Sequence, residues 1–369
     1  MTTTKKTFPR LFEPTSIGAM RLKNRIAMAP MVSKSGDESG FVTQLTKDYY
    51  CARAKGGAGL IIVEATYVDH PRGRGYRNQL SIADDKHIPG LKALAKDIQE
   101  CGSKAAIQIQ HSGPATKTSL AGTQPVAPSA VPVRGWEIPR ELTTAEVNDI
   151  IREFGDGAHR ARKAGFDGIE IHAAHYYLLA CFLSPACNKR TDKYGGSTEN
   201  RSRVLVEIIQ AMKHAAGKDY PVWIRFNGEE YGTDEALSHD EAKRIAQIAG
   251  YAGADAIHVS CWDLGANSFS TMGKKIKPMD VPYGFMVHLA EGIKKVVNIP
   301  VIAVGRITPE IAEEALEQGK ADIVAIGRGL IADPELPNKA AQGKVNDINI
   351  CIACGDCNTR NMVCSQFSV

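Results

Sequence analysis

The stretch VIAVGRITPEIAEEALEQGKADIVAIGRG, residues 301–329, contains two β-rich runs separated by a helical segment. The runs at 301–304 and 323–326 are built almost entirely from valine, isoleucine and alanine, and residues 309–318 between them have the apolar period of an amphipathic helix. Gly319 follows that segment, as expected at a helix C-terminus. This order predicts two parallel strands joined by a helix.

The same alternation extends back toward the N-terminus. Further β-rich runs lie at residues 26–29, 60–63, 105–109, 168–171, 222–225 and 256–259. Helical segments lie between them, for example at residues 87–100, 145–164, 200–215, 239–252 and 285–297. Eight such units predict the α/β class and a closed (β/α)8 TIM barrel. We expect this barrel to occupy residues 1–340, with a short cysteine-rich C-terminal extension over residues 341–369.

Composition excludes several classes of function. The chain has 369 residues, 43% of them hydrophobic, and a formal net charge of +4 without a block of like charges. This charge pattern gives no reason to expect binding to nucleic acid or to a membrane surface. No apolar run reaches the roughly 18–20 residues of a membrane helix, and the N-terminal residues lack the apolar core of a secretion signal. We therefore expect a cytoplasmic protein.

Glycine and arginine follow both of the last two β-rich runs. Gly305 and Arg306 come after the first run, and Gly327 and Arg328 come after the second. Glycines allow close approach of the backbone N–H groups to an anion, and arginines add charge and forked hydrogen bonds. Barrels commonly hold a cofactor phosphate at this place. Two surface turns with solvated arginines are the alternative.

The segment after the fourth β-rich run carries candidate catalytic groups. His172 and His175 are three residues apart, and Tyr177 follows them. Two imidazole donors can hold one carbonyl oxygen and make a conjugated C=C accept hydride at its β-carbon, while a neutral phenol can supply a proton. A zinc site is an alternative, although no third ligand lies nearby in the sequence. A structural histidine pair in the core is another.

Together these segments resemble the old yellow enzyme family of flavin oxidoreductases. The stretches that carry the resemblance, in the family's order, are LFEPTSIGAMRLKNRIAMAPM (11–31), GGAGLIIVEATYV (56–68), IQIQHSG (107–113), GFDGIEIHAAHYYLLACFLSPACNKRTDKYGGSTENRSR (165–203), VIAVGRI (301–307) and ADIVAIGRGLIADPELPNK (321–339). They cover essentially residues 10–364. Three positions, Val32, Pro114 and Tyr176, depart from the residues that are usual in the family.

The resemblance implies a bound FMN. By motif position, the residues assigned to the flavin and its phosphate are Ala29, Pro30, Met31, Ala65, Gln108, Arg225, Gly305, Arg306, Gly327 and Arg328. Gln108 would hydrogen-bond the pyrimidine edge of the isoalloxazine, and Arg225 would stabilise the reduced, anionic flavin near N1 and O2. In the same comparison, His172 and His175 match the substrate-anchoring pair and Tyr177 matches the proton donor.

Four of the nine cysteines lie close to the C-terminus. Cys351, Cys354 and Cys357 are spaced by three residues, and Cys364 follows. Such a run can wrap a [4Fe–4S] cube, whereas structural zinc prefers two separated Cys-x-x-Cys pairs. A zinc site and no metal at all are the alternatives. The run resembles that of the cluster-bearing branch of the family, which includes dienoyl-CoA reductases, enoate reductases and trimethylamine dehydrogenase.

Three functions are compatible with these residues. The first is reduction of the C=C bond of an α,β-unsaturated carbonyl or acyl thioester, with Tyr177 as the acid. The second is an amine dehydrogenase or demethylase of the trimethylamine dehydrogenase type, for which Trp262 and Asp263 could form part of a site for a cationic amine. The third is a flavin-storing or electron-transfer subunit. Loops 65–80, 110–140 and 262–285 are expected to select a small-molecule substrate.

The electron source and the oligomeric state are further expectations. No G-x-G-x-x-G motif follows any β-rich run, so no separate dinucleotide module is expected. Electrons would come from NAD(P)H or, through the cluster, from a separate flavoprotein or ferredoxin. A homo-oligomer is compatible with the sequence.

Overall fold

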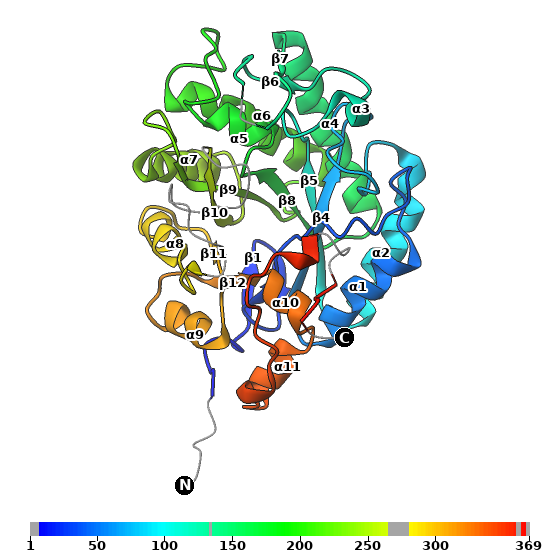
Figure 1. The fold of residues 1–369 in the computed structure, drawn as a ribbon, viewed down its shortest axis with the longest axis vertical. Helices are drawn as coiled ribbons and strands as arrows, with labels where there is room; N and C mark the ends of the chain where they lie inside the picture. The colour runs from blue at the N-terminus through cyan, green and yellow to red at the C-terminus, as the bar shows by residue number, and fades with distance from the viewer. Residues whose placement is uncertain (1–6, 133–134, 265–279, 359–362, 367–369) are drawn as a thin grey trace.

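The computed structural model describes residues 7–132, 135–264, 280–358 and 363–366. In this part of the chain, eight parallel strands close into one barrel surrounded by helices, which confirms the predicted fold (Figure 1). The barrel strands are β3 (Ile26–Met28), β4 (Leu60–Tyr67), β5 (Lys104–Gln110), β8 (Gly168–Ala173), β9 (Val222–Tyr231), β10 (Ile257–Asp263), β11 (Val301–Ala303) and β12 (Ile323–Ile326). The barrel closes where Val324 of β12 pairs with Ile26 of β3.

The helices around the barrel begin and end where local side chains satisfy the backbone. The outer helices include α1 (Gln44–Lys55), α2 (Ile88–Glu100), α4 (Thr144–Lys163), α6 (Thr198–Ala216), α7 (His239–Tyr251), α8 (Val287–Lys294) and α9 (Pro309–Glu317). Thr143 caps α4 in a capping box with Glu146, and Ser238 caps α7 in the same way with Glu241. Gly319 follows α9 with φ of 65°, a conformation that favours glycine and ends the helix as predicted.

Several strands are longer than their hydrophobic runs. The sequence predicts that Arg225 and Ser260 end their strands, but β9 continues to Tyr231 and β10 to Asp263. His172 likewise lies inside β8 instead of after it. Backbone pairing continues beyond the apolar residues, with a register shift in the β9–β10 pair at Ser260. The side chains therefore change from apolar to polar before the strand ends, and the polar groups lie on the β-sheet and not on loops.

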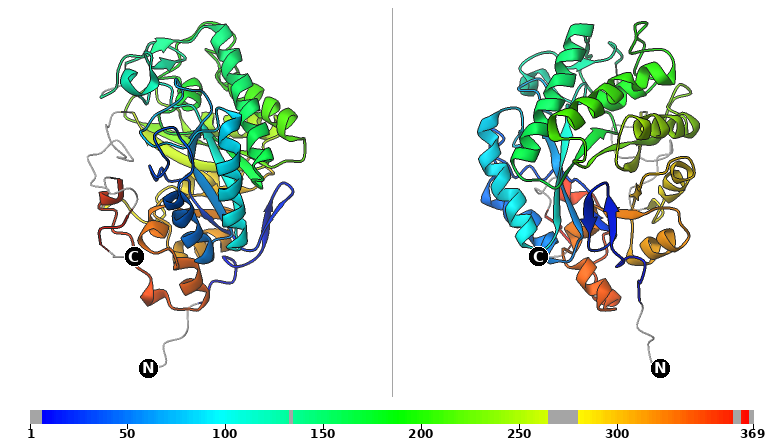
Figure 2. Two further views of the ribbon diagram at one scale, coloured as in Figure 1. Left: turned by 90° about the vertical axis from the view of Figure 1, so that its right-hand side faces the viewer. Right: turned by 180° about the vertical axis from the view of Figure 1, so that it is seen from behind.

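The two ends of the chain lie on opposite sides of the barrel. The N-terminal hairpin of β1 (Thr15–Ile17) and β2 (Met20–Leu22) is on one side, and the cysteine-containing segment is on the other (Figure 2). That segment follows α10 (Arg328–Ala332) and α11 (Leu336–Ala341). Its residues Ile348 and Cys357 belong to the same continuous apolar core as the barrel. None of the helices in the described residues is both long enough and apolar enough to cross a bilayer.

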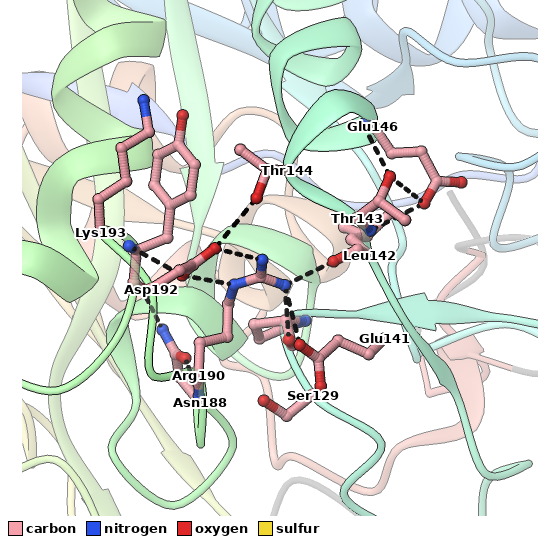
Figure 3. A network of polar contacts seen from close by, with 12 residues as sticks. Ser129, Glu141, Leu142, Thr143, Thr144, Glu146, Asn188, Arg190, Asp192 and Lys193 are labelled. Carbon is pink, nitrogen blue, oxygen red and sulfur yellow. Dashed lines mark hydrogen bonds and ion pairs between the residues drawn. The ribbon is translucent and has the colours of Figure 1, made fainter.

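The long motif at residues 165–203 contains a buried arginine, Arg190, that connects loops distant in the sequence. Arg190 forms a bidentate ion pair with Asp192, with N···O distances of 3.0 and 2.6 Å. Its Nη1 atom also donates to the carbonyl oxygens of Pro128 and Leu142, at 3.1 and 2.5 Å. Figure 3 shows the guanidinium between these groups. The long motif therefore fixes the connection between β5 and α4 against the segment that follows β8.

We expect Arg190→Ala to lower the free energy of unfolding by about 2–4 kcal/mol, because it leaves buried carbonyls and Asp192 without their cationic donor. Urea unfolding followed by circular dichroism measures this change. Arg152→Ala is the matched control, since Arg152 forms an exposed ion pair with Asp149 and should unfold near the wild-type midpoint. Equal midpoints for the two variants would contradict the structural role of Arg190.

Candidate active site at the barrel mouth

His172, His175 and Tyr177 converge, as the sequence predicts. The ring centroids of the two histidines are 5.1 Å apart, and Tyr177 lies 4.6 Å from His172 and 6.2 Å from His175. Spacing of three residues would bring two histidines together in a helical bend, but this expectation is wrong for His172 and His175. His172 is in β8, His175 has the left-handed backbone φ of 60°, and α5 (Leu178–Leu183) begins only after Tyr177. A tight turn therefore brings the three rings together.

Asn227 of β9 holds the turn at His175. Its Oδ1 accepts from the backbone N–H of His175 at 2.7 Å, and its Nδ2 donates to the His175 carbonyl at 3.0 Å. Asn227 also donates to the buried Glu230 carboxylate at 3.0 Å, and Ser184 donates to the other oxygen of that carboxylate at 2.6 Å. These reciprocal hydrogen bonds offset the cost of a left-handed backbone at a non-glycine residue.

Burial and positive neighbours keep both imidazoles neutral. Desolvation lowers the pKa of His172 well below its ordinary value of 6.5, and its electrostatic interactions with His175 and Arg225 lower it further. Desolvation, with Arg225 next in importance, lowers the pKa of His175 in the same direction. Burial raises the pKa of Tyr177, although Arg225 offsets part of the increase. At neutral pH the site therefore presents two uncharged imidazoles and a protonated phenol.

Arg225 is a buried cation with unused hydrogen-bonding capacity. It is 7% exposed, and its Nε atom has no hydrogen-bond partner among the described residues. Such a group is costly in a protein interior unless a ligand satisfies it. The pyrimidine edge of a flavin, with two carbonyl oxygens, suits this donor. The residue therefore fits the predicted FMN.

Gln108 and Ala65 stand opposite one another on neighbouring strands. The β4–β5 register shifts between Val63 and Thr66, so the chain bulges at Glu64 and Ala65, opposite Gln108. Gln108 is 1% exposed, and its Nε2 atom donates to Glu170 at 2.8 Å. A bulge of this kind re-aims side chains at a barrel rim.

The segment after β3 is fastened by a buried carboxylate. Ala29, Pro30 and Met31 follow β3, and both the backbone N–H and the hydroxyl of Ser33 donate to Glu64, the hydroxyl at 2.9 Å. Burial raises the pKa of Glu64 to about 7, although the hydrogen bonds from Ser33 oppose this increase. Glu64 thus holds the backbone that is predicted to lie along the flavin.

The four predicted phosphate residues line one hollow, here called the arginine hollow. It encloses about 570 Å³ of empty space, part of it open solvent, and its wall includes Gly305, Arg306, Gly327 and Arg328 together with Tyr283, Asn349 and Cys351. Gly305 has φ of 119°, which favours glycine. Arg306 lies 4.1 Å above the ring of Tyr283. The hollow can hold an anion between two guanidinium groups.

The four predicted cysteine ligands line a second hollow, here called the cysteine hollow. Its wall contains Cys351, Cys354, Cys357 and Cys364, together with Arg328, which also borders the arginine hollow. The backbone N–H of Ala353 donates to the Cys351 sulfur at 3.4 Å. Within the described residues, no group of three or more His, Cys, Asp or Glu side chains is arranged to hold a metal ion. The four cysteines share this hollow.

The loop after β4 is tied to the connection that follows β5. Asp69 accepts from Arg72 at 2.5 Å and contacts His111 at 3.1 Å, and Arg72 also reaches Glu146 at 3.4 Å. Burial opposes ionisation of Asp69, but the hydrogen bonds from His111 and Arg72 hold its pKa at about 2.

Of the predicted substrate-selecting loops 110–140 and 262–285, residues 133–134 and 265–279 lie outside the described residues.

Sequence reasoning missed the residues that support the site. These are Glu64, Glu170, Trp223, Asn227, Glu230 and His258. Glu170, Trp223 and His258 lie within β-rich runs that are otherwise hydrophobic, whereas Glu64, Asn227 and Glu230 lie after such runs. An acidic residue inside such a run, as in Ile169-Glu170-Ile171, was the available signal, because buried carboxylates need donors.

The two neutral histidines predict a pH dependence of stability. Because their folded-state pKa values lie below 6.5, the unfolded chain binds more protons as the pH falls through about 6.5, and stability present above that pH is lost. We expect the free energy of unfolding to fall less between pH 7.5 and 5.5 in the double variant His172→Asn/His175→Asn than in the wild type. Urea titrations at both pH values measure this, and the exposed His214→Asn variant should keep the wild-type slope. Equal slopes in the double variant and the wild type would refute neutral histidines.

Comparisons with known proteins identify the family of this chain. Residues 10–347 match the family described as NADH:flavin oxidoreductase / NADH oxidase. The chain is 47% identical over 351 residues to an NADH oxidase of Thermoanaerobacter brockii, covering 94% of this chain and 53% of that protein. It is 40% identical over 343 residues to an NADPH dehydrogenase of Clostridium acetobutylicum, covering 92% and 96%. The chain thus spans about half of the first relative and nearly all of the second.

Similar solved structures also have this fold. A 2-naphthoyl-CoA reductase complex superposes with a TM-score of 0.89 at 32% identity, covering 95% of this chain and 54% of that chain. Histamine dehydrogenase from Rhizobium sp. 4-9 superposes with a TM-score of 0.85 at 30% identity, covering 97% and 51%. The chain therefore belongs to the NADH:flavin oxidoreductase / NADH oxidase family, the old yellow enzyme family.

Proposed function

We propose that this protein reduces the C=C bond of an α,β-unsaturated carbonyl compound or acyl thioester. The observation that carries the proposal is the convergence of two neutral histidines and one protonated tyrosine. Bound FMN would supply the hydride, and its ring and phosphate would be held by the residues that the sequence assigns to it, from Ala29 to Arg328. The remaining chemistry belongs to side chains of this chain.

The two histidines would bind the substrate oxygen. Neutral imidazoles donate N–H groups without adding positive charge, so they suit an uncharged carbonyl whose oxygen gains negative charge in the transition state. The Nε2 atom of His175 is 3.0 Å from the Ser260 hydroxyl, which could orient the ring. Tyr177 would then transfer its phenolic proton to the α-carbon, since its raised pKa keeps it protonated throughout the neutral range.

An amine substrate is the second candidate. Trp262 lies 5.6 Å from His175, centroid to centroid, and the buried Asp263 is next to it in β10. An aromatic face and a carboxylate are the groups that bind a cationic amine. The histamine dehydrogenase similarity supports this alternative. Anaerobic bleaching of the flavin by a methylated amine would favour it over ene reduction.

We also propose that the cysteine hollow holds a [4Fe–4S] cluster. A single zinc ion needs sulfurs at about 2.3 Å from its centre, and the described cysteines are not grouped in that way. A cube instead binds one thiolate at each of four separate corners, and four cysteines around one hollow suit that geometry. Cys351 and Arg328 border both hollows, so a cluster would lie beside the FMN phosphate site.

Electrons would reach the flavin from NADH or NADPH, or through the cluster from a separate flavoprotein or ferredoxin. The names of the relatives, NADH oxidase and NADPH dehydrogenase, support a nicotinamide donor. Anaerobic mixing with NADH, NADPH or reduced ferredoxin, followed by flavin absorbance, ranks these donors by rate.

Tyr177→Phe should slow reoxidation of the reduced enzyme by 2-cyclohexenone by about 10²–10⁴-fold, because the α-carbon loses its proton donor. Stopped-flow absorbance of the flavin under anaerobic conditions measures the rate. Tyr251→Phe is the matched control, since Tyr251 is 89% exposed at the end of α7, outside the barrel mouth. A wild-type rate for Tyr177→Phe would remove this residue from the mechanism.

Cys357→Ser should abolish most of the iron and acid-labile sulfide that co-purify with the protein, because it removes the buried member of the four cysteines. Anaerobic purification, metal analysis and electron paramagnetic resonance of the reduced protein test this. Cys51→Ser, which lies on α1 away from the C-terminal run, should keep the wild-type iron content. Wild-type protein with zinc and without sulfide would overturn the cluster proposal.

A further inference from the structure

A network of four buried side chains crosses the inside of the barrel. Glu170 of β8 is its centre, and its carboxylate accepts from Gln108 Nε2 at 2.8 Å and from Trp223 Nε1 at 2.7 Å. His258 Nδ1 is 2.7 Å from the same carboxylate. Glu170 and His258 are both 0% exposed. Because β9 separates β8 from β10 in the sheet, the Glu170–His258 contact passes through the barrel interior.

Glu170 fixes the orientation of the Gln108 amide. An ionised carboxylate can only accept hydrogen bonds, so the NH2 group of Gln108 must face Glu170 and its Oε1 atom must point away. The pyrimidine edge of a flavin presents one N–H donor, at N3, between two carbonyl acceptors. If Gln108 meets that edge, as the proposed function requires, its Oε1 is the acceptor for N3–H. A reversed amide would place two donors together.

Glu170 also stabilises the charge of Arg225, which lies in register with His172 of β8 and with His258 of β10. Burial opposes ionisation of Glu170, but His258 and Arg225 outweigh it and lower the pKa of the carboxyl. Burial lowers the pKa of Arg225, and Glu170 is the main group that opposes this decrease. Each side chain therefore stabilises the charged form of the other. A carboxylate beside Arg225 cancels part of the positive field that would otherwise favour an anionic ligand.

We propose that Glu170 is a positioning residue for the flavin site, which orients Gln108 toward the flavin N3–H and lowers the reduction potential of bound FMN by offsetting the charge of Arg225. This inference rests on the proposed roles of Gln108 and Arg225. His258 and Trp223 serve it by donating to the carboxylate. The second ring nitrogen of His258 has no hydrogen-bond partner among the described residues, so donation to Glu170 is the polar contact that the structure gives this ring.

Two substitutions separate charge from orientation. Glu170→Gln removes the charge, and we expect the equilibrium between bound FMN and a reference dye of known potential to shift toward reduced flavin by about ten-fold or more. Glu170→Asp keeps the charge but is too short to reach Gln108 in the same way. It should leave the potential nearer to the wild-type value and weaken FMN binding, measured by fluorescence titration of the apoprotein.

A matched control and a second variant keep the test decisive. Glu313→Gln removes another buried carboxylate, which accepts from the backbone of Arg10 and Leu11 away from the network, and should leave the potential unchanged. If Glu170→Gln does not fold, Trp223→Phe removes one of the donors that keep the carboxylate ionised, so Glu170 is protonated more easily and the potential should move in the same direction by a smaller factor.

The outcomes distinguish this inference from the proposed function. Wild-type protein that binds no FMN would overturn the proposed function itself. Wild-type protein that binds FMN, with an unchanged potential and FMN affinity in Glu170→Gln, would overturn the role of Glu170 alone. An equal shift in Glu313→Gln would also overturn it, because the effect would then be a general response to loss of a buried charge.

Discussion

Pairing of β12 with β3 closes the barrel, and the site depends on this closure. Ile26, Ala27 and Met28 pair in parallel with Val324, Ala325 and Ile326. The eight barrel strands run in the same direction, so their carboxyl ends meet at one mouth of the barrel. Residues from Ala29 to Arg328 therefore lie in one region. The hollows lined by Arg328 and the three-ring cluster on β8 are both products of that geometry.

Buried charge is the second constraint. Burial, together with the charge of Arg225 inside the barrel, lowers the pKa of His172 and His175 and keeps both imidazoles neutral. Glu170 balances part of the charge and is itself satisfied by three donors. A buried cation without such an anion would be costly, and a buried anion without donors would be protonated. The charge at the barrel mouth therefore depends on Glu170 and its donors, which lie deeper in the barrel and need not contact a substrate.

The longest family motif has a mainly structural role. In residues 182–203, Ser184 donates to Glu230, Arg190 bridges Asp192 and the loop carbonyls, and Arg201 pairs with Glu241 at 2.5 Å. Through Glu230 and Asn227, this scaffold reaches the turn at His175. The residues that make the family easy to recognise are thus those that hold the segment of His172, His175 and Tyr177 in place. Their specificity explains why the resemblance was reliable.

Local pattern was sufficient for the architecture. Alternating β-rich and helical runs predicted the barrel, glycines predicted helix ends, and spacing placed two histidines and a tyrosine together. These features depend on interactions between residues close in sequence, which a single chain reveals. The motifs also indicated an arginine after each of the last two strands and four clustered cysteines, and the structure places both sets around neighbouring hollows.

Tertiary structure alone decided how these groups are held. The left-handed turn at His175 exists because Asn227, 52 residues away, clamps it. The extension of β9 and β10 beyond their apolar runs depends on pairing with neighbouring strands. The Glu170 network joins residues of four strands, and its Glu170–His258 contact alone connects residues 88 positions apart. Such contacts leave no local pattern in the sequence. In the sequence a buried acidic residue only interrupts a hydrophobic run, because its hydrogen-bond donors come from other strands of the barrel.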